Sequence, residues 1–200
     1  VTTNLGEILL LISALILNLP LPLTAVMILW VNLVTDGPSD IAIGVEPKQK
    51  SLLKDKPRSP GEGILNKEII LRMLLLAPIM AAGTLYLYWY ELQINELEKA
   101  KTIAFTTLAA FQWFNAFNAR SSRFSIFQVG IFTNKWVAIA VGGAIVLHLG
   151  AIYTGFGNTI FSTVPLNLID WAWIVLISSS IFAADEIRKF MLRKRNNIKY

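Results

Sequence analysis

The sequence has no cysteine, a single histidine and few charged residues. Charged side chains make up 16% of the 200 residues, whereas an average soluble protein has roughly 25%. Without cysteine, neither a disulfide framework nor a thiolate metal site can form. The one histidine, His148, lies inside an apolar stretch, where we expect it to be buried by packing and not to relay protons. The scarcity of charge excludes an ordinary soluble domain.

Long apolar stretches dominate the chain instead. Hydrophobic residues make up 54% of it, and the mean hydropathy is +0.56. A helix of about 20 apolar residues crosses the hydrocarbon core of a bilayer. Stretches that meet or nearly meet this length run over residues 2–19, 23–43, 69–90, 102–118, 136–153 and 168–184. We therefore predict an all-α membrane protein, a bundle of six transmembrane helices with short loops, paired as hairpins over about 2–43, 69–118 and 136–184.

The basic residues predict the orientation of this bundle. All but two of the 18 Lys and Arg residues, the exceptions being Lys99 and Lys101, fall on one side. This assignment counts Arg72, Arg120 and Lys189 among the loop and tail residues. Because Lys and Arg concentrate in cytoplasmic loops, this side is predicted to be cytoplasmic, together with the C-terminus and the start of the first helix. Topology thus accounts for the net charge of +5, and we expect no nucleic-acid partner.

Aromatic residues gather on the opposite side of the predicted bundle. Tyr and Trp rings prefer the level of the lipid headgroups, so we interpret this group as an interfacial belt. Its members at the end of the third stretch are Tyr86, Tyr88, Trp89 and Tyr90.

Several polar residues interrupt the apolar helices. An ionisable group at the centre of a membrane helix costs about 2.5 kcal/mol or more, so such residues need a partner or a function. Residues three or four positions apart share one face of a helix, and the polar residues of each stretch follow this spacing. They are Asn4 and Glu7 in the first stretch, Asn32, Thr35 and Asp36 in the second, and Gln112 and Asn115 in the fourth.

Every one of these side chains offers an oxygen atom, and none offers a thiol or an imidazole. A set of this kind excludes a site built for zinc or copper and favours a hard cation. Ca²⁺ takes 6 to 8 oxygen ligands, which carboxylates, amides, a hydroxyl, backbone carbonyls and water could supply. Protons or sodium are compatible with the same chemistry. The alternative is that these groups only form hydrogen bonds between helices.

A predicted helix break lies beside three of these residues. Gly37 and Pro38 directly follow Asp36. Pro38 cannot donate a hydrogen bond to the carbonyl of Val34, and its ring crowds that carbonyl, so we expect the helix to kink or unwind there. Transporters use broken helices of this kind to line polar cavities and to expose carbonyl groups to ions.

Four segments of the sequence resemble one protein family. The run Leu29-Trp-Val-Asn-Leu-Val-Thr-Asp-Gly37 resembles the sixth transmembrane helix of P-type calcium-transporting ATPases, the group that contains the sarco/endoplasmic reticulum pump. Thr3-Asn-Leu-Gly-Glu7 resembles the ligand stretch of the fifth helix, Lys56-Pro-Arg-Ser-Pro60 the loop between the sixth and seventh, and Asp185-Glu-Ile-Arg-Lys-Phe190 the end of the tenth. By this resemblance, residues 1–200 are the C-terminal transmembrane cation-binding domain of such a pump, its fifth to tenth helices.

The resemblance also implies roles for the polar residues. Asn4 and Glu7 are similar to ligands of one ion site, Thr35 adds to that site, Asn32 belongs to a second site, and Asp36 bridges both. Asn115 matches the polar stripe of the family's eighth helix and is a possible further ligand. The metal-site residues implied are thus Asn4, Glu7, Asn32, Thr35, Asp36 and Gln112.

The sequence departs from the family pattern at Gln112, where the calcium pump has a glutamate. The amide removes one negative charge, which favours one strong divalent site. Sodium/potassium pumps have glutamine at this position, but they have an aspartate where Asn32 stands, so the match is closer to the calcium branch.

The resemblance implies that this chain is part of an ATP-driven pump that exports Ca²⁺ from the cytoplasm by alternating access. Mg²⁺ and ATP would act only through cytoplasmic domains absent from this chain, so the segment alone is not expected to be an enzyme, whereas the full-length protein is. Its expected partners are the remaining helices and cytoplasmic domains of the pump and the lipid bilayer, in the plasma membrane of a prokaryote. The alternatives are a Na⁺ or Mn²⁺ pump of the same fold and a non-catalytic membrane subunit.

Overall fold

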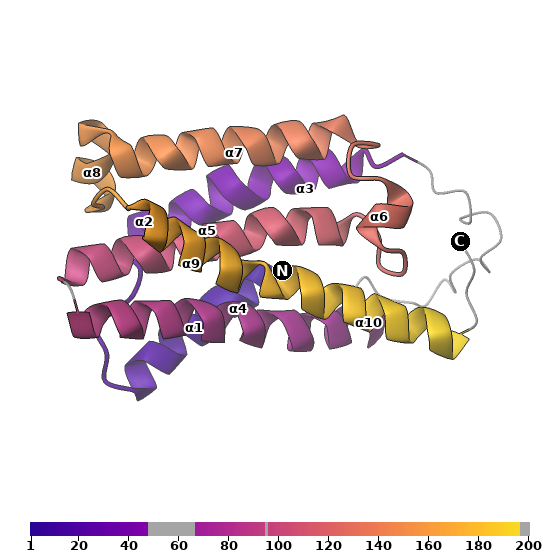
Figure 1. Cartoon of the computed structure of the whole chain (residues 1–200), viewed down its shortest axis with the longest axis horizontal. Helices are drawn as coiled ribbons and strands as arrows, with labels where there is room; N and C mark the ends of the chain where they lie inside the picture. The colour runs from indigo at the N-terminus through magenta and orange to yellow at the C-terminus, as the bar shows by residue number, and fades with distance from the viewer. Residues whose placement is uncertain (48–66, 95, 197–200) are drawn as a thin grey trace.

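The apolar stretches form long helices that run along one common axis (Figure 1). The structure is a computed structural model that describes residues 1–47, 67–94 and 96–196, and this part of the chain contains helices and no strand. The helices are α1 (Thr2–Ile16), α2 (Ala25–Trp30), η1 (Val31–Asp36), α3 (Gly37–Gly44), α4 (Lys67–Ile94), α5 (Leu97–Ala119), α6 (Ile126–Val129), α7 (Lys135–Tyr153), α8 (Gly155–Phe161), α9 (Leu168–Ser178) and α10 (Ser180–Asn196). Residues 48–66, which include the Lys56–Pro60 segment, lie outside the described residues.

Four helical stretches of the described chain are long and apolar enough to cross a membrane. They are Ala25–Gly44, which combines α2, η1 and α3; Lys67–Ile94; Lys135–Tyr153; and Leu168–Arg195, which combines α9 and α10. α1 is apolar but has only 15 residues. α5 has the length but carries more polar residues. The predicted all-helical membrane class is confirmed.

A short turn joins α1 to α2. Asn18 has a positive φ of 51°, and the amide of Leu19 donates to the carbonyl of Ala14 over 2.9 Å. This is the pattern in which a left-handed residue ends a helix and satisfies its last carbonyls. The Thr24 hydroxyl then accepts a hydrogen bond from the amide of Met27 and caps the start of α2. The loop between these two helices is therefore short, although α1 packs most extensively on α4.

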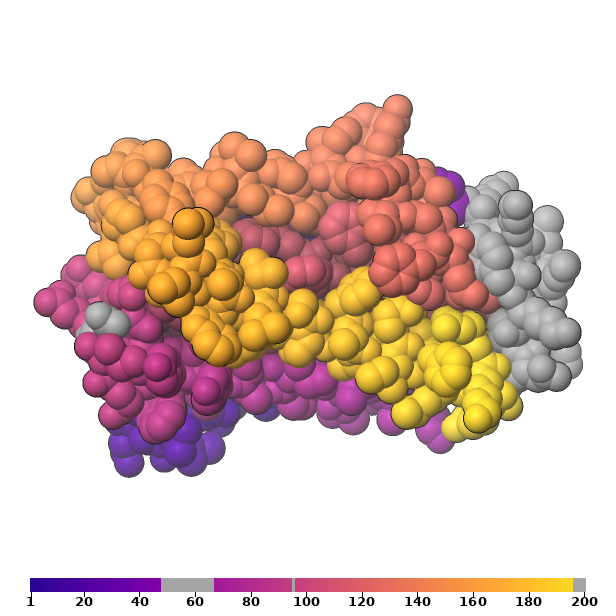
Figure 2. All heavy atoms as spheres, in the orientation of Figure 1, coloured from indigo at the N-terminus to yellow at the C-terminus, as the bar shows by residue number. Residues whose placement is uncertain are grey.

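α5 is the central helix of the bundle. It packs against α4, α9, α10, η1, α7 and α3, and most of its residues are buried. In Figure 2, α9 and α10 cover the middle of the face nearest the viewer. The hydroxyls of Thr102 and Thr106 bond back to carbonyls one turn earlier, each over 2.8 Å. Because neighbouring helices shield α5 from lipid, it tolerates polar residues that a lipid-facing helix would not.

Small residues allow α4 to approach its neighbours closely. A Cβ atom at Gly83 would lie 2.7 Å from Phe111 of α5 and 2.9 Å from Ile177 of α9. A Cβ atom at Gly6 of α1 would lie 3.3 Å from the Cβ of Met80. Close packing of this kind is a main source of helix association in membranes, where the lipid is as apolar as the side chains.

Three of the basic residues assigned to the cytoplasmic side are buried in the bundle and do not project from loops. Arg72 is part of α4 and its side chain is 17% exposed. Arg120, just after α5, and Lys189 of α10 are almost fully buried. Arg120 pairs with Glu46 at 2.8 Å, and Lys189 pairs with Asp185 at 3.2 Å. Their positive charges therefore connect helices as well as bias the topology.

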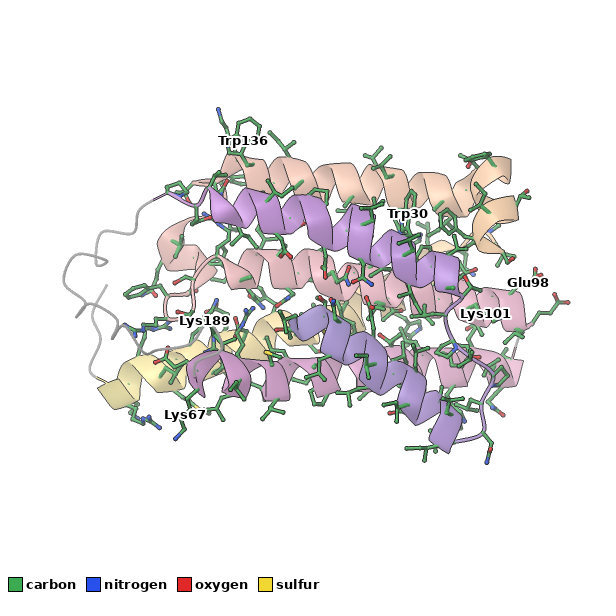
Figure 3. All side chains as sticks on the ribbon, turned by 180° about the vertical axis from the view of Figure 1, so that it is seen from behind. Trp30, Lys67, Glu98, Lys101, Trp136 and Lys189 are labelled. Carbon is green, nitrogen blue, oxygen red and sulfur yellow. The ribbon has the colours of Figure 1, made fainter. Side chains whose placement is uncertain are left out.

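The two ends of the bundle still differ in charge as expected. Lys67, Trp136 and Lys189 lie toward one end and Glu98 and Lys101 toward the other (Figure 3). The start of α1 lies midway along the bundle (Figure 1).

The predicted aromatic belt is only partly at the surface. Tyr86, Trp89 and Tyr90 are exposed, whereas Tyr88 is fully buried. The Tyr88 hydroxyl donates to the carbonyl of Pro20 over 2.8 Å and so ties α4 to the turn after α1. Tyr88 thus belongs to the core.

His148 is buried as predicted. It has no exposed surface, and its Nε2 lies 3.2 Å from the hydroxyl of Thr106. The imidazole ring contacts the rings of Phe105 and Trp113. It fills space between α7 and α5.

Candidate cation-binding site

The helix that carries Asn32, Thr35 and Asp36 changes its geometry at those residues. Residues Val31–Asp36 form a π-helix, and the amide of Gly37 donates to the carbonyl of Asn32, five residues earlier. Pro38 then occupies the first turn of α3, where a missing amide hydrogen is tolerated. The helix was expected to kink or unwind at Pro38, but it continues to Gly44. The wider π-helical turn before Pro38 accommodates the proline ring instead.

The π-helix explains how this segment presents its polar groups. π-helical turns occur mostly as short bulges and often at functional sites. The side-chain amide of Asn32 donates to the carbonyl of Ile28 over 3.0 Å, and the hydroxyl of Ser39 donates to the carbonyl of Thr35 over 3.0 Å. These bonds keep the backbone satisfied around the widened turn.

α1 faces this segment with Thr3 and Glu7. Glu7 is 4% exposed, and its Oε2 accepts a hydrogen bond from Asn32 over 3.0 Å. The Thr3 hydroxyl donates to the carboxylate of Asp36. Because Thr3 and Glu7 are one turn apart, both reach the π-helix from the same face of α1. Asn4, one residue further round, is exposed in this chain.

Glu7 and Asp36 are near enough to repel each other electrostatically, and the Gln112 side chain lies beside Glu7. Repulsion between two partly or fully buried carboxylates is unfavourable unless a positive charge lies between them. The arrangement brings together negative charge from α1 and from η1.

Several polar atoms of this cluster are buried without a hydrogen-bond partner. They are Oε1 of Glu7, Oγ1 of Thr35, and both Oε1 and Nε2 of Gln112. Each such atom costs about 1–3 kcal/mol when it is left unsatisfied, and native structures keep few of them. Three of these atoms are oxygens from three different helices, so they are available to a ligand. Buried polar atoms without a partner also occur elsewhere in the bundle, for example in Thr84 and Trp113.

A cavity of about 110 Å³ opens beside this cluster. It has room for a cation together with water molecules. Its walls include the predicted residues Asp36, Gln112 and Asn115, whereas Asn4, Glu7, Asn32 and Thr35 do not line it. Its lining residues are Val1, Thr2, Thr3, Asp36, Ser39, Asp40, Ile43, Arg72, Gln112, Asn115, Ala116 and Ala119.

The chemistry of the cluster fits a hard cation with mixed oxygen ligands. Within the described ranges, no three His, Cys, Asp or Glu side chains are grouped as a metal site. Carboxylates from Glu7 and Asp36 would therefore have to act with amide and hydroxyl oxygens and with water. Such mixed sets are typical of Ca²⁺ sites.

Asn115 has a partner that its sequence position does not indicate. Its Oδ1 accepts a hydrogen bond from Nη2 of Arg72 over 2.8 Å. The amide oxygen that could have contacted a cation is thus engaged by a guanidinium group.

Sequence reasoning missed four residues of this region: Thr3, Ser39, Asp40 and Arg72. Asp40 lies four residues after Asp36, and this spacing is a signal for a shared face that could have been used. Thr3 precedes Asn4, and the pattern alone does not decide which of the two turns inward. Arg72 gave no signal of its own, since a basic residue near the start of a membrane helix is typical of a cytoplasmic boundary.

The sequence matches known proteins over nearly its whole length. The family described as "Cation transporting ATPase, C-terminus" matches residues 20–191. Calcium-transporting ATPase type 2C member 2 of Mus musculus is 36% identical over 200 residues, which is 97% of this chain and 21% of that protein. Calcium-transporting ATPase 1 of Saccharomyces cerevisiae is 39% identical over 181 residues, 90% of this chain and 19% of that protein. The chain spans about a fifth of the length of these curated relatives.

Proposed function

The chain belongs to the family of C-terminal regions of cation-transporting ATPases, and from this premise we propose that it forms the ion-binding membrane domain of an ATP-driven pump that exports Ca²⁺ from the cytoplasm. The observation that carries the proposal is the cluster of partnerless buried oxygens from Glu7, Thr35 and Gln112. It lies at the π-helix beside Asp36. The names of the relatives support calcium as the transported ion.

We propose the ligands as follows. Glu7 and Asp36 supply the two negative charges that balance one divalent cation, and Asn32, Thr35 and Gln112 supply neutral oxygens. The hydrogen bonds from Asn32 to Glu7 and from Thr3 to Asp36 hold the carboxylates in place. Asn4 stays a proposed ligand on its sequence position alone, because it is exposed in this chain and its Oδ1 accepts a hydrogen bond from the hydroxyl of Thr3 over 3.1 Å.

We propose a six-crossing topology with a cytoplasmic C-terminus. α1 and α5 would cross the membrane alongside the four long apolar stretches, α5 because its neighbours shield its polar residues. The basic residues at one end of the bundle support a cytoplasmic position for that end. The proposed membrane is the plasma membrane of a prokaryote, although the relatives named above come from a mouse and a yeast.

In this proposal Mg²⁺ and ATP act through cytoplasmic domains outside this chain. Phosphorylation of those domains would drive a movement that opens the site to one side of the membrane and then to the other. The remaining helices of the pump and the lipid bilayer are its proposed partners. The π-helix is a suitable place for this movement, since its widened turn can tighten to an α-helix without breaking.

The experiment is phosphorylation of the full-length pump by ATP in membranes, measured against free Ca²⁺. Replacing Asp36 by Asn removes one of the two charges at the site and is expected to abolish Ca²⁺-dependent phosphorylation. The matched control is E98Q, which also replaces a carboxylate by an amide. Glu98 is exposed at the start of α5, away from the site, so this variant should leave phosphorylation unchanged. Undiminished Ca²⁺-dependent phosphorylation in D36N would refute the proposed site. Phosphorylation of the unmodified pump by ATP that depends on Na⁺ or Mn²⁺ and not on Ca²⁺ would identify a different transported ion.

A further inference from the structure

A buried arginine lies at the end of α5, outside the candidate cation site. The side chain of Arg120 has no exposed surface. Its Nε and Nη2 donate to the carboxylate of Glu46, which follows α3, over 2.8–3.1 Å. Nη1 donates to the carbonyls of Gly130 and Ile131, each over 2.8 Å, and Nη2 also donates to the hydroxyl of Thr133. One guanidinium group thus binds both the end of α3 and the loop before α7.

Asn134 holds the same end of α3 from the side of α7. Its side-chain amide donates to the carbonyl of Ala42 in α3 over 2.9 Å and to the carboxylate of Glu46 over 2.7 Å. Its Oδ1 accepts hydrogen bonds from two backbone amides in the first turn of α7. α3, which lies beside α7 (Figure 1), is therefore fixed by α5 through Arg120 and by α7 through Asn134.

The helix that is fixed in this way carries three of the proposed ligands. η1 and α3 follow each other without a break from Val31 to Gly44, and η1 packs against α5. Asp36 precedes Glu46 by ten residues, and Gln112 precedes Arg120 by eight. At 1.5 Å per residue, these separations are about 15 Å and about 12 Å along the two helices. A shift of α3 along α5 at the ion pair would therefore move Asp36 relative to Gln112.

The physical chemistry of such a pair suits positioning better than stabilisation. A buried ion pair is weak evidence for stability, because both charges lose their hydration, and fixing a register is its best-attested use. A bidentate arginine–carboxylate pair fixes direction as well as distance. The residues of a binding site have to be held within about 0.5 Å of their productive places, so a small shift in register is enough to weaken the site.

We propose that Arg120 and Glu46 are positioning residues for the cation site. Their ion pair sets the register of the η1–α3 helix on α5, and with it the distance of Thr35 and Asp36 from Gln112. The inference rests on the proposed function. It adds to the site a determinant of affinity that contacts no ligand residue, so disrupting the pair weakens cation binding while every ligand stays in the chain.

The test is equilibrium binding of ⁴⁵Ca²⁺ to the full-length pump in the absence of ATP. This measurement separates the half-saturating Ca²⁺ concentration from the amount bound at saturation. E46Q removes the charge but keeps an oxygen that can accept from Arg120, so it should fold. Its half-saturating concentration should rise at least about three-fold, less than the 10- to 100-fold typical of groups that contact a metal ligand directly. The amount bound at saturation should stay the same.

A second variant and a control complete the test. R120K keeps the charge but cannot form the bidentate pair, so it should raise the half-saturating concentration too and decides the question if E46Q does not accumulate. E91Q serves as the control, because Glu91 of α4 pairs with Lys99 in the first turn of α5 at 2.8 Å, the same distance as in the Arg120 pair. Lys99 keeps Asp170 at 3.2 Å, and α4 carries no proposed ligand, so E91Q should leave the half-saturating concentration unchanged.

Two results would overturn the inference. One is an unchanged half-saturating Ca²⁺ concentration in both E46Q and R120K, with only the melting temperature or the amount bound at saturation lowered, as a purely structural pair would give. The other is an equal rise in E91Q, which would make the effect a general consequence of destabilising the bundle. If the unmodified pump binds no Ca²⁺ and shows no Ca²⁺-dependent phosphorylation, the proposed function itself fails, and this inference fails with it.

Discussion

The buried carboxylate of Asp185 offers a sharp test of how the bundle is held together. We consider its replacement by Asn, which keeps the shape of the side chain and removes the charge. Asp185 is fully buried and lies within 3.5 Å of a nitrogen of Arg72, 2.7 Å of Arg188 and 3.2 Å of Lys189. The exchange therefore removes the shared counter-charge of three cations at once.

The cost follows mainly from Lys189. Its side chain is 1% exposed, so its ammonium group cannot turn to water. After the exchange it keeps the carbonyl of Asn118 at 3.0 Å and the carboxylate of Glu186 at 3.8 Å. Breaking a buried ion pair by removing one partner costs about 3–5 kcal/mol. At about 2–4 °C per kcal/mol for a unit of this size, the unfolding temperature should fall by roughly 6 °C or more.

The assay heats the full-length pump in detergent and measures the folded fraction by size-exclusion chromatography. The matched control is E186Q, the neighbouring residue in the same helix, whose side chain is 20% exposed. A partly exposed pair at 3.8 Å contributes about 1 kcal/mol or less, so E186Q should melt close to the unmodified pump. Equal melting temperatures for D185N and E186Q would show that the buried cluster does not stabilise the bundle.

Two further predictions concern the site and the packing. Q112E should tighten Ca²⁺ binding at least about ten-fold, because the new carboxylate adds a negative charge beside Glu7; an unchanged Ca²⁺ dependence of phosphorylation would count against Gln112 as a ligand. G83A should destabilise the pump by about 1–3 kcal/mol, because the new methyl group would overlap with Phe111 and Ile177. G143A, where nothing lies within 4 Å of the new Cβ, should be neutral or slightly stabilising, and equal melting temperatures for the two glycine variants would contradict the close packing of α4.

Much of the fold could be predicted from the sequence, because long apolar runs indicate membrane helices. The predicted stretch 136–153 differs from α7 by one residue at its start. The end of α10 was harder to predict. Its last turn carries Arg193, Lys194 and Arg195, and a run of basic residues is typical of an extended tail. Cations at a helix C-terminus are, however, stabilised by the helix dipole, so these residues can belong to the helix.

The candidate site was predictable in its components and not in its details. Asp36 and Gln112 do line a common cavity, as polar residues inside membrane helices are expected to do. The direction in which Thr3 and Asn4 point depends on the rotation of α1 about its axis, which is set by packing on α4. Local spacing carries no information about that rotation.

The charges of the cavity were the least predictable feature. Arg72 and Lys189 have the sequence position of boundary residues, and only the meeting of α4, α5 and α10 shows that they are paired inside the bundle. The π-helix was similarly hidden, because Pro38 is compatible with a kink, an unwound turn or a widened one. The geometry that the helix adopts here depends on the hydrogen bonds that the side chains of Asn32 and Ser39 donate to backbone carbonyls.

The most direct test of the central claim is the position of the ion itself. We suggest an anomalous diffraction measurement on crystals of the full-length pump grown with Ca²⁺. The account predicts an anomalous peak between the carboxylates of Glu7 and Asp36, with oxygen atoms of both at about 2.3–2.6 Å from the ion. A peak elsewhere in the membrane domain, with these two carboxylates empty, would contradict it.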